Sequence, residues 1–169
     1  MPNAVRTTLL LAVVLTTATL FASPVRAAST YSDRVSGFET YASSTEGRFS
    51  GVAAGDLPGW WSTVVLHAPL SGRKPAAITG GSFDLETVLD WSPENVSGSI
   101  TGGSVTQVAG FRGCANQQYE VVGTLSSVGL GGGGGTGTFD LTLTHYRTSV
   151  FGHCFTYSAT VTGAIKLQF

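Results

Sequence analysis

The stretch 155–169, FTYSATVTGAIKLQF, decides the fold class of this chain. Its odd positions carry mostly apolar residues, and its even positions carry mostly Thr, Ser, Lys and Gln. Period-two alternation of this length is typical of a half-buried antiparallel strand, because successive side chains of a strand point to opposite faces. The pattern runs to Phe169, so we expect the C-terminus to be held in a sheet.

The same alternation, interrupted by glycine- and proline-rich turns, recurs through most of the preceding chain. The expected strands are about eight segments: 48–54, 60–68, 78–91, 96–100, 105–111, 119–125, 139–146 and 155–169. Short connections favour an up-and-down order, and about eight such strands can close into a barrel. We therefore predict an all-β fold, a small antiparallel meander β-barrel, with a two-sheet β-sandwich as the alternative.

Two segments depart from this alternation. Residues 28–47 are polar, and their apolar anchors stand about three residues apart, so we expect an irregular lead-in or a short helix. Gly102 and Gly103 lie between two short apolar arms, a composition that favours the tight turn of a hairpin. The predicted organisation is a signal peptide over 1–27, a lead-in over 28–47 and one barrel domain over 48–169.

The N-terminal segment has the pattern of a cleaved secretory signal peptide. Arg6 precedes the apolar run Leu9–Leu15, Pro24 ends the apolar region, and Val25-Arg26-Ala27 fits a cleavage site after Ala27. The alternative is an uncleaved membrane anchor. We expect a secreted, extracellular protein, and no later segment is long and apolar enough to span a bilayer.

The charge content disfavours two classes of partner. The whole chain has nine Lys and Arg and ten Asp and Glu; without Arg6 and Arg26, seven oppose ten and the net charge is −3. No basic stripe follows a phosphate backbone, so we expect no nucleic-acid partner. No polybasic cluster favours an anionic membrane either.

Cys114 and Cys154 are the two cysteines of the chain. In a meander both would begin strands at the same rim, so in an oxidising compartment we expect one disulfide. It would close a loop of about forty residues and stabilise the fold by roughly 4 kcal/mol on the chain-entropy estimate. A reactive thiol or a metal ligand is the alternative.

The polar candidates for chemistry are few. His145 could act as a general acid–base residue, and it could gather with Arg147, Arg112 and His153 at the disulfide rim, although a half-buried rim histidine is the simpler interpretation. Asp84, Glu86 and Asp90 share one strand face, which we interpret as the solvent side. No carboxylate or third histidine completes a metal set, and no cofactor motif is present, so we expect neither metal nor cofactor.

Trp60 and Trp61 are the best binding candidates. Adjacent strand residues point to opposite faces, so one tryptophan must leave the core, either as a contact surface or covered by the lead-in. The run from Gly129 to Gly137 is interpreted as a flexible glycine-rich hairpin loop rather than a phosphate loop, because no lysine or helix follows it. Asn95-Val96-Ser97 matches the glycosylation sequon.

Three functions fit these observations. The first is a secreted, non-catalytic barrel that binds an apolar small molecule or an extracellular surface partner, through Trp60, Trp61, His145 or Arg147. The second is a barrel enzyme of isomerase or cyclase type with His145 as its acid–base residue. The third is a structural or inhibitor protein without a pocket. The expected architecture resembles lipocalin-like, allene-oxide-cyclase-like and dirigent-like barrels, a likeness that assigns no residue a role.

Overall fold

The computed structural model describes residues 28–89, 92–128 and 134–169, so the expected signal peptide, residues 1–27, lies outside the described residues. The described residues form one closed antiparallel barrel in which each strand pairs with the next along the chain and β1 pairs with β8. Its strands are β1 (Thr30–Ala42), β2 (Glu46–Gly55), β3 (Gly59–His67), β4 (Ala76–Leu89), β5 (Ser92–Ala109), β6 (Gln117–Val128), β7 (Gly134–Val150) and β8 (His153–Gln168). The predicted all-β meander barrel is confirmed. Among these residues, no helix is long and apolar enough to cross a membrane.

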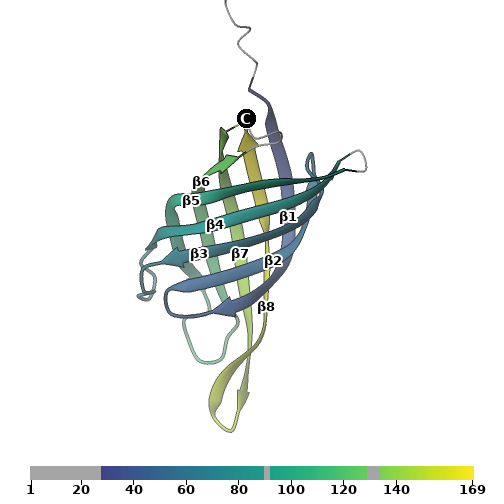
Figure 1. Ribbon diagram of the computed structural model, residues 1–169. Coiled ribbons are helices and arrows are strands. Elements are labelled where there is room, and N and C mark those ends of the chain that lie inside the picture. The colour runs from purple at the N-terminus through teal and green to yellow at the C-terminus, as the bar shows by residue number, and fades with distance from the viewer. Residues whose placement is uncertain (1–27, 90–91, 129–133) are drawn as a thin grey trace, which may run out of the picture.

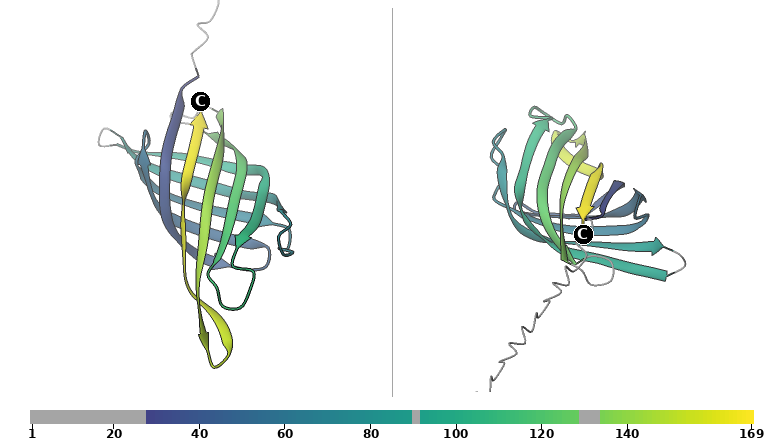
Figure 2. Two further views of the ribbon diagram at one scale, coloured as in Figure 1. Left: turned by 180° about the vertical axis from the view of Figure 1, so that it is seen from behind. Right: turned by 90° about the horizontal axis from the view of Figure 1, so that it is seen from above.

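The barrel is flattened. Strands β2–β5 run across the front of the molecule in Figure 1, whereas β6, β7, β8 and β1 run steeply behind them. The view from behind and the view from above show the same two crossing halves (Figure 2). Inward-facing side chains of the two halves therefore meet directly and fill the space between them.

Strand β8 follows the predicted alternation where it lies in the barrel wall. Val161, Ile165 and Leu167 are buried, whereas Thr162 is exposed. The C-terminus is held as expected, because the backbones of Ser29 and Phe169 exchange two hydrogen bonds of 2.9 and 3.0 Å. At the other end, β7 and β8 continue beyond the barrel as a hairpin (Figure 1), so apolar residues of that part of β8 lie in solvent.

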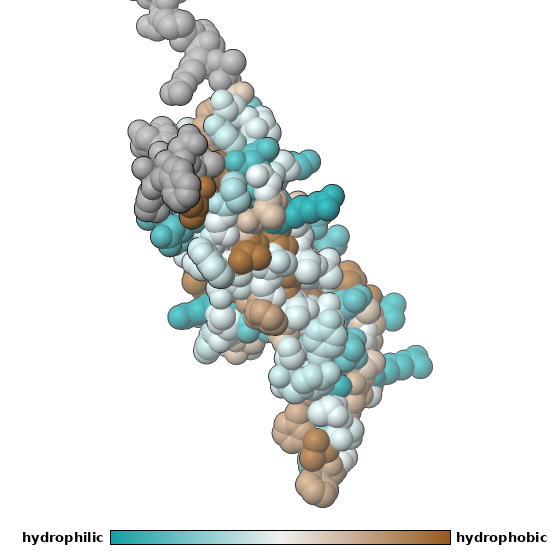
Figure 3. Space-filling view, turned by 90° about the vertical axis from the view of Figure 1, so that its right-hand side faces the viewer, coloured by the Kyte–Doolittle hydropathy of each residue, from teal (hydrophilic) through white to brown (hydrophobic). Residues whose placement is uncertain are grey.

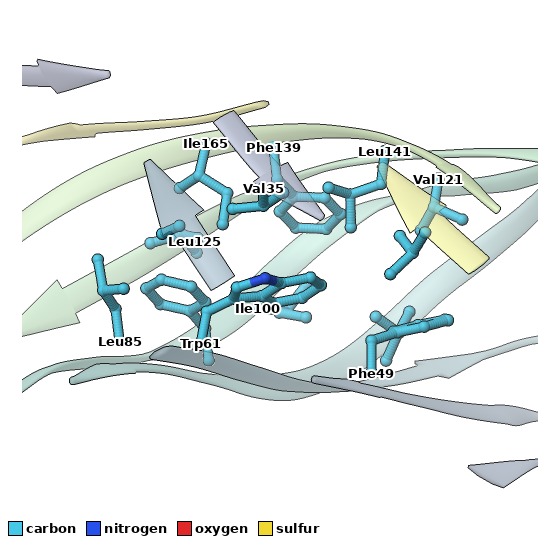
Figure 4. Close-up of a cluster of buried hydrophobic side chains, with 14 of the residues drawn as sticks. Val35, Phe49, Trp61, Leu85, Ile100, Val121, Leu125, Phe139, Leu141 and Ile165 are labelled. Atoms are coloured by element: carbon cyan, nitrogen blue, oxygen red, sulfur yellow. The ribbon is translucent and has the colours of Figure 1, made fainter. Parts of the chain in front are cut away.

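Trp61 is the largest fully buried side chain of the core. It points inward among aliphatic and aromatic residues from both halves of the barrel (Figure 4). Its Nε1–H donates to the backbone oxygen of Ser36 at 3.3 Å, so the indole reaches from β3 across β2 to β1. The residue of β2 between them is Gly51, where a Cβ would lie 1.9 Å from that same oxygen. Glycine at this position is therefore required.

The interior leaves no room for a ligand at its centre. The cavity beside Trp61, Phe83 and Phe139 has a volume of about 10 Å³. This is at the lower limit of the space that one water molecule needs. The core is thus packed by its own side chains.

The expected irregular lead-in over 28–47 is wrong, because β1 and the start of β2 occupy it. Its inward positions alternate in the structure, but Asp33, Gly37 and Glu39 stand among them and conceal the apolar period. The apolar spacing of about three came instead from residues on both faces of the strand.

The predicted hairpin at Gly102-Gly103 is also wrong. Strand β5 continues through these glycines, and the pairing with β6 shifts by one residue between Ile100 and Gly102. A glycine pair can serve a β-bulge as well as a turn. The expected number of strands was nevertheless right, because the sequence analysis missed β1 but counted β5 as two strands.

Cys114 and Cys154 form the predicted disulfide, with their Cα atoms 5.4 Å apart. The bond joins the β5–β6 loop to the start of β8, at the end of the barrel where the β7–β8 hairpin projects. Within the expected glycine-rich loop, residues 134–137 belong to β7, and residues 129–133 lie outside the described residues.

Asp33 is an exception to the apolar interior, because only 2% of its surface is exposed. Its Oδ1 accepts a hydrogen bond from the Leu57 N–H at 2.8 Å, and its Oδ2 has no hydrogen-bond partner among the described residues. Burial raises the pKa of Asp33; the bond from Leu57 opposes this rise, and the charge of Asp56 adds to it.

We predict that Asp33 makes the barrel less stable as the pH rises. A raised pKa means that the folded state binds the proton more tightly than the unfolded state, where the pKa is near 3.8. The resulting stabilisation is complete below that value and is lost as the pH rises through the folded-state pKa. The urea midpoint of the wild-type protein should fall between pH 3.5 and about pH 7. This fall should be absent in Asp33→Asn and present in Asp140→Asn, a control at an exposed site. A fall of equal size in wild type and Asp33→Asn would contradict this.

The two faces of β8 should differ in their contribution to stability. Ile165→Ala removes buried methyl groups and should lower the free energy of unfolding by about 2–5 kcal/mol. Thr162→Ala, on the exposed face of the same strand, should change it by no more than about 0.5 kcal/mol. Urea denaturation of both variants measures the difference, and equal losses would show that the outer face of β8 is covered as well.

Candidate functional site

The four predicted binding residues lie in two separate places. Trp60 and Trp61 occupy β3 and point to opposite faces, with exposed fractions of 65% and 2%. His145 and Arg147 lie on β7 near the end of the barrel that carries the disulfide, which we call the mouth. The structure therefore offers two candidate sites, one on the outer wall around Trp60 and one inside the mouth around His145.

The first site is a groove of about 970 Å³ on the outer wall, which we call the outer groove. It crosses β8, β1, β2, β3, β4 and β5, and its main side chains are Ser36, Phe38, Ser50, Val52, Trp60, Ser62, Asp84, Glu86, Asn95, Thr160 and Thr162. Phe38 belongs to the lead-in that was one of two alternatives for covering a tryptophan, but it is itself exposed and lines the same groove as Trp60.

Strand register explains why these residues meet. Phe38 pairs with Ser50, Ser50 with Ser62, and Ser62 with Asp84, so one row of outward positions runs across four strands. The neighbouring row contains Val52, Trp60 and Glu86 in the same order of strands. Small serines in the middle of one row, beside large rings, leave the wall hollowed at this place.

The groove is acidic at one end. Asp84 and Glu86 are exposed, as the sequence predicted, whereas Asp90 lies outside the described residues. Neither Asp84 nor Glu86 forms an ion pair or a side-chain hydrogen bond within the part of the chain that the structure describes. Asn95, the residue of the sequon, pairs with Glu86 and is also exposed. The groove thus combines aromatic faces, hydroxyl groups and two carboxylates that are available to a ligand.

The second site is a cluster of polar side chains inside the mouth, formed by Glu39, His67, Tyr119 and His145. The Nε2–H of His145 donates to Oε2 of Glu39 at 2.7 Å, and both side chains are largely buried, with 16% and 8% exposed. The ring of Tyr119 packs against that of His145, with centroids 5.2 Å apart. The Nδ1–H of His67 donates to the Ala68 carbonyl at 2.8 Å. A cavity of about 150 Å³ adjoins these residues.

Tyr119 keeps its proton at neutral pH. Burial raises the pKa of its phenol, the Arg147 cation opposes that rise, and the Glu39 carboxylate adds to it. The hydroxyl donates to Oε1 of Gln117 at 3.2 Å. The phenol hydrogen of Tyr119 is therefore already used in the hydrogen bond to Gln117.

Glu39 is the residue that the sequence did not reveal. It lies 106 positions from His145 and within the segment that was expected to be irregular. Recognising β1 as a strand would have placed Glu39 on the inward face with Val35 and Gly37. Even so, only barrel closure brings β1 next to β8 and β7 at the mouth.

Arg147 does not join the mouth cluster through a hydrogen bond. Its backbone N–H donates to Oδ1 of Asn116 at 3.0 Å, and its Nη1 donates to the Gly113 carbonyl at 3.3 Å. Both acceptors belong to the β5–β6 loop that carries Cys114. Arg147 therefore fastens this loop to the base of the hairpin, beside the disulfide.

In the described ranges, no three His, Cys, Asp or Glu side chains gather closely enough to hold a metal ion. Comparisons of the chain with protein-family models, with curated proteins and with solved structures find no match. What the chain does must therefore be inferred from its own side chains.

The Glu39–His145 pair should behave as one coupled unit in folding. Replacing either residue alone by leucine leaves the other buried polar group without its partner, which costs about 1–3 kcal/mol. The double variant Glu39→Leu/His145→Leu should lose less than the sum of the single losses. Urea unfolding of the four proteins forms a double-mutant cycle that measures the coupling. Additive losses would show that the pair does not act as a unit.

Proposed function

We propose that this chain is a secreted, non-catalytic binding barrel that holds an extracellular carbohydrate in its outer groove. The observation that carries the proposal is the exposure of Trp60 and Phe38 in a hollow of the wall, beside serine and threonine hydroxyls and two carboxylates that have no partner among the described residues. A large aromatic ring exposed in a concave site marks a contact surface rather than a part of the fold.

The chemistry of the groove favours a sugar over an apolar molecule. The C–H faces of a pyranose ring stack on aromatic faces, here those of Trp60 and Phe38. The hydroxyl groups of the same sugar donate to carboxylates such as Asp84 and Glu86, and charged acceptors form the stronger hydrogen bonds. An apolar ligand would leave these carboxylates and the serine hydroxyls of the outer groove without hydrogen-bond partners, which would lower its affinity.

The packed interior supports a ligand on the outside. Barrels that enclose a small molecule keep an open lumen, whereas the centre of this one is filled around Trp61. The extracellular setting is supported by the N-terminal pattern of a signal peptide and by a disulfide, which is typical of oxidising compartments.

A second candidate function is an enzyme that works at the mouth. The hydrogen bond between His145 and Glu39 favours it, because a carboxylate that orients an imidazole is a common arrangement in acid–base catalysis. The adjoining cavity of about 150 Å³ is smaller than usual ligand pockets, which start at about 300 Å³. We therefore rank this function below carbohydrate binding.

The outer groove is tested with an array of immobilised oligosaccharides. We expect the secreted protein to bind members of the array, and Trp60→Ala to weaken that binding about tenfold or more, whereas Trp60→Phe retains a stacking face and most of the affinity. Asp84→Asn/Glu86→Gln should also weaken it about tenfold, because each removes a charged acceptor.

The control is His145→Gln, which changes the mouth and leaves the groove intact. Binding that survives Trp60→Ala would contradict the proposal, as would an array without any bound member. Loss of binding in His145→Gln, with the groove variants unaffected, would move the site to the mouth and favour the second candidate.

A further inference from the structure

We propose that the mouth of the barrel is a docking surface for an anionic lipid bilayer. Its apolar part is the tip patch of the β7–β8 hairpin, which consists of Val150, Phe151, Phe155 and Tyr157. Its charged part consists of four cationic side chains, Arg73, Lys74, Arg112 and Arg147. Neither part belongs to the outer groove or to the polar cluster inside the mouth.

The tip patch projects into solvent. Phe151 is 99% exposed, and the other three residues of the patch are exposed as well. Apolar surface gathers at the lower end of the molecule in Figure 3, which is the end of the β7–β8 hairpin in Figure 1. Thr148 pairs with Phe155 and Val150 pairs with His153, so Val150 and Phe155 share one face of the hairpin.

Folding does not explain a phenylalanine at position 151. Its φ is +50°, in the left-handed region that glycine and asparagine adopt with less strain than a bulky residue. The side chain buries almost nothing in return. An exposed aromatic ring in a strained backbone position points to a role outside the folded core.

The cations come from separate parts of the chain, which is why the sequence shows no polybasic cluster. The fold ties them to one rim. The Arg73 guanidinium lies 4.3 Å from the centroid of the Phe111 ring in the β5–β6 loop. The disulfide joins that loop to the hairpin, and Arg147 donates a hydrogen bond to the carbonyl of Gly113.

No carboxylate opposes these cations in the connecting segments. Residues 43–45, 68–75, 110–116 and 147–157, which form the rim and the hairpin, contain no Asp or Glu. Three carboxylates lie within four residues of these segments: Glu39 and Glu46 are paired with His145 and Arg48, and Glu120 lies on β6. The rim is therefore positively charged although the protein as a whole is slightly acidic.

This combination fits a lipid surface with anionic headgroups. Aromatic and aliphatic side chains enter the headgroup region, and flanking Arg and Lys attract its negative charge. The projecting tip patch can insert into a fluid bilayer directly, whereas a protein partner would need a pocket shaped to receive Phe151. The disulfide and the Arg147 hydrogen bonds hold the rim in place before contact, which lowers the ordering cost of binding.

The test is sedimentation of the mature, oxidised protein with vesicles of phosphatidylcholine, with and without phosphatidylglycerol. We expect binding to the phosphatidylglycerol vesicles that falls with added salt, and weak or no binding to pure phosphatidylcholine. Each of Arg73→Gln, Lys74→Gln and Arg112→Gln should weaken binding about fivefold. Phe151→Gly/Phe155→Ser should abolish it.

Folding is controlled in the same series. Phe151→Gly alone should weaken vesicle binding but keep or raise the thermal midpoint, because it relieves the strained φ, so that the weaker binding is not a loss of fold. Trp60→Ala, an exposed aromatic on the outer wall, should leave vesicle binding unchanged. Equal binding to both vesicle types, no binding to either, or full binding by Phe151→Gly/Phe155→Ser would overturn the proposal. A wild-type dimer that Phe151→Gly dissociates, with vesicles unbound, would identify a second copy as the occupant and overturn it too.

Discussion

The indole of Trp61 crosses strand β2 to reach the Ser36 carbonyl, and both faces of the barrel wall depend on this contact. Inside, it fills the flattened barrel and leaves no lumen. Outside, it fixes the orientation of the next residue, because a strand that buries Trp61 must expose Trp60. Gly51 makes the contact possible by removing the side chain that would stand between the indole and β1.

The fold class was predictable because the alternation of apolar and polar residues is visible in the sequence of strands such as β8. In β8, the inward residues Val161, Ile165 and Leu167 are apolar, Thr162 and Lys166 face outward, and no inward position carries a charge. Strand β1 was missed because its inward positions include Asp33, Gly37 and Glu39, whose roles are tertiary. Asp33 accepts a bond from the β2–β3 turn, and Glu39 accepts one from β7. The alternation of apolar and polar residues cannot identify a strand whose inward residues are polar because they bind other parts of the fold.

The candidate sites were predictable only one residue at a time. Strand alternation predicts that one of Trp60 and Trp61 lies outside, and the structure shows which. The groove around Trp60 draws on six strands, and its shape depends on register, which a single sequence does not specify. The same holds at the mouth, where one cation–π contact links Arg73 to the β5–β6 loop that carries Arg112, and one disulfide and one pair of hydrogen bonds link that loop to the hairpin and Arg147.

A filled barrel moves recognition to its outer wall and its rims, and here the two proposed surfaces do not compete. The outer groove is lined by residues such as Ser50, Ser62 and Asp84, which lie within their strands and not in the connections at the mouth. The tip patch lies beyond the barrel, at the end of the hairpin (Figure 1). A bilayer at the mouth would therefore leave the groove open on the side of the molecule. The barrel could then hold a carbohydrate and a membrane at the same time, with the rigid wall setting the distance between them.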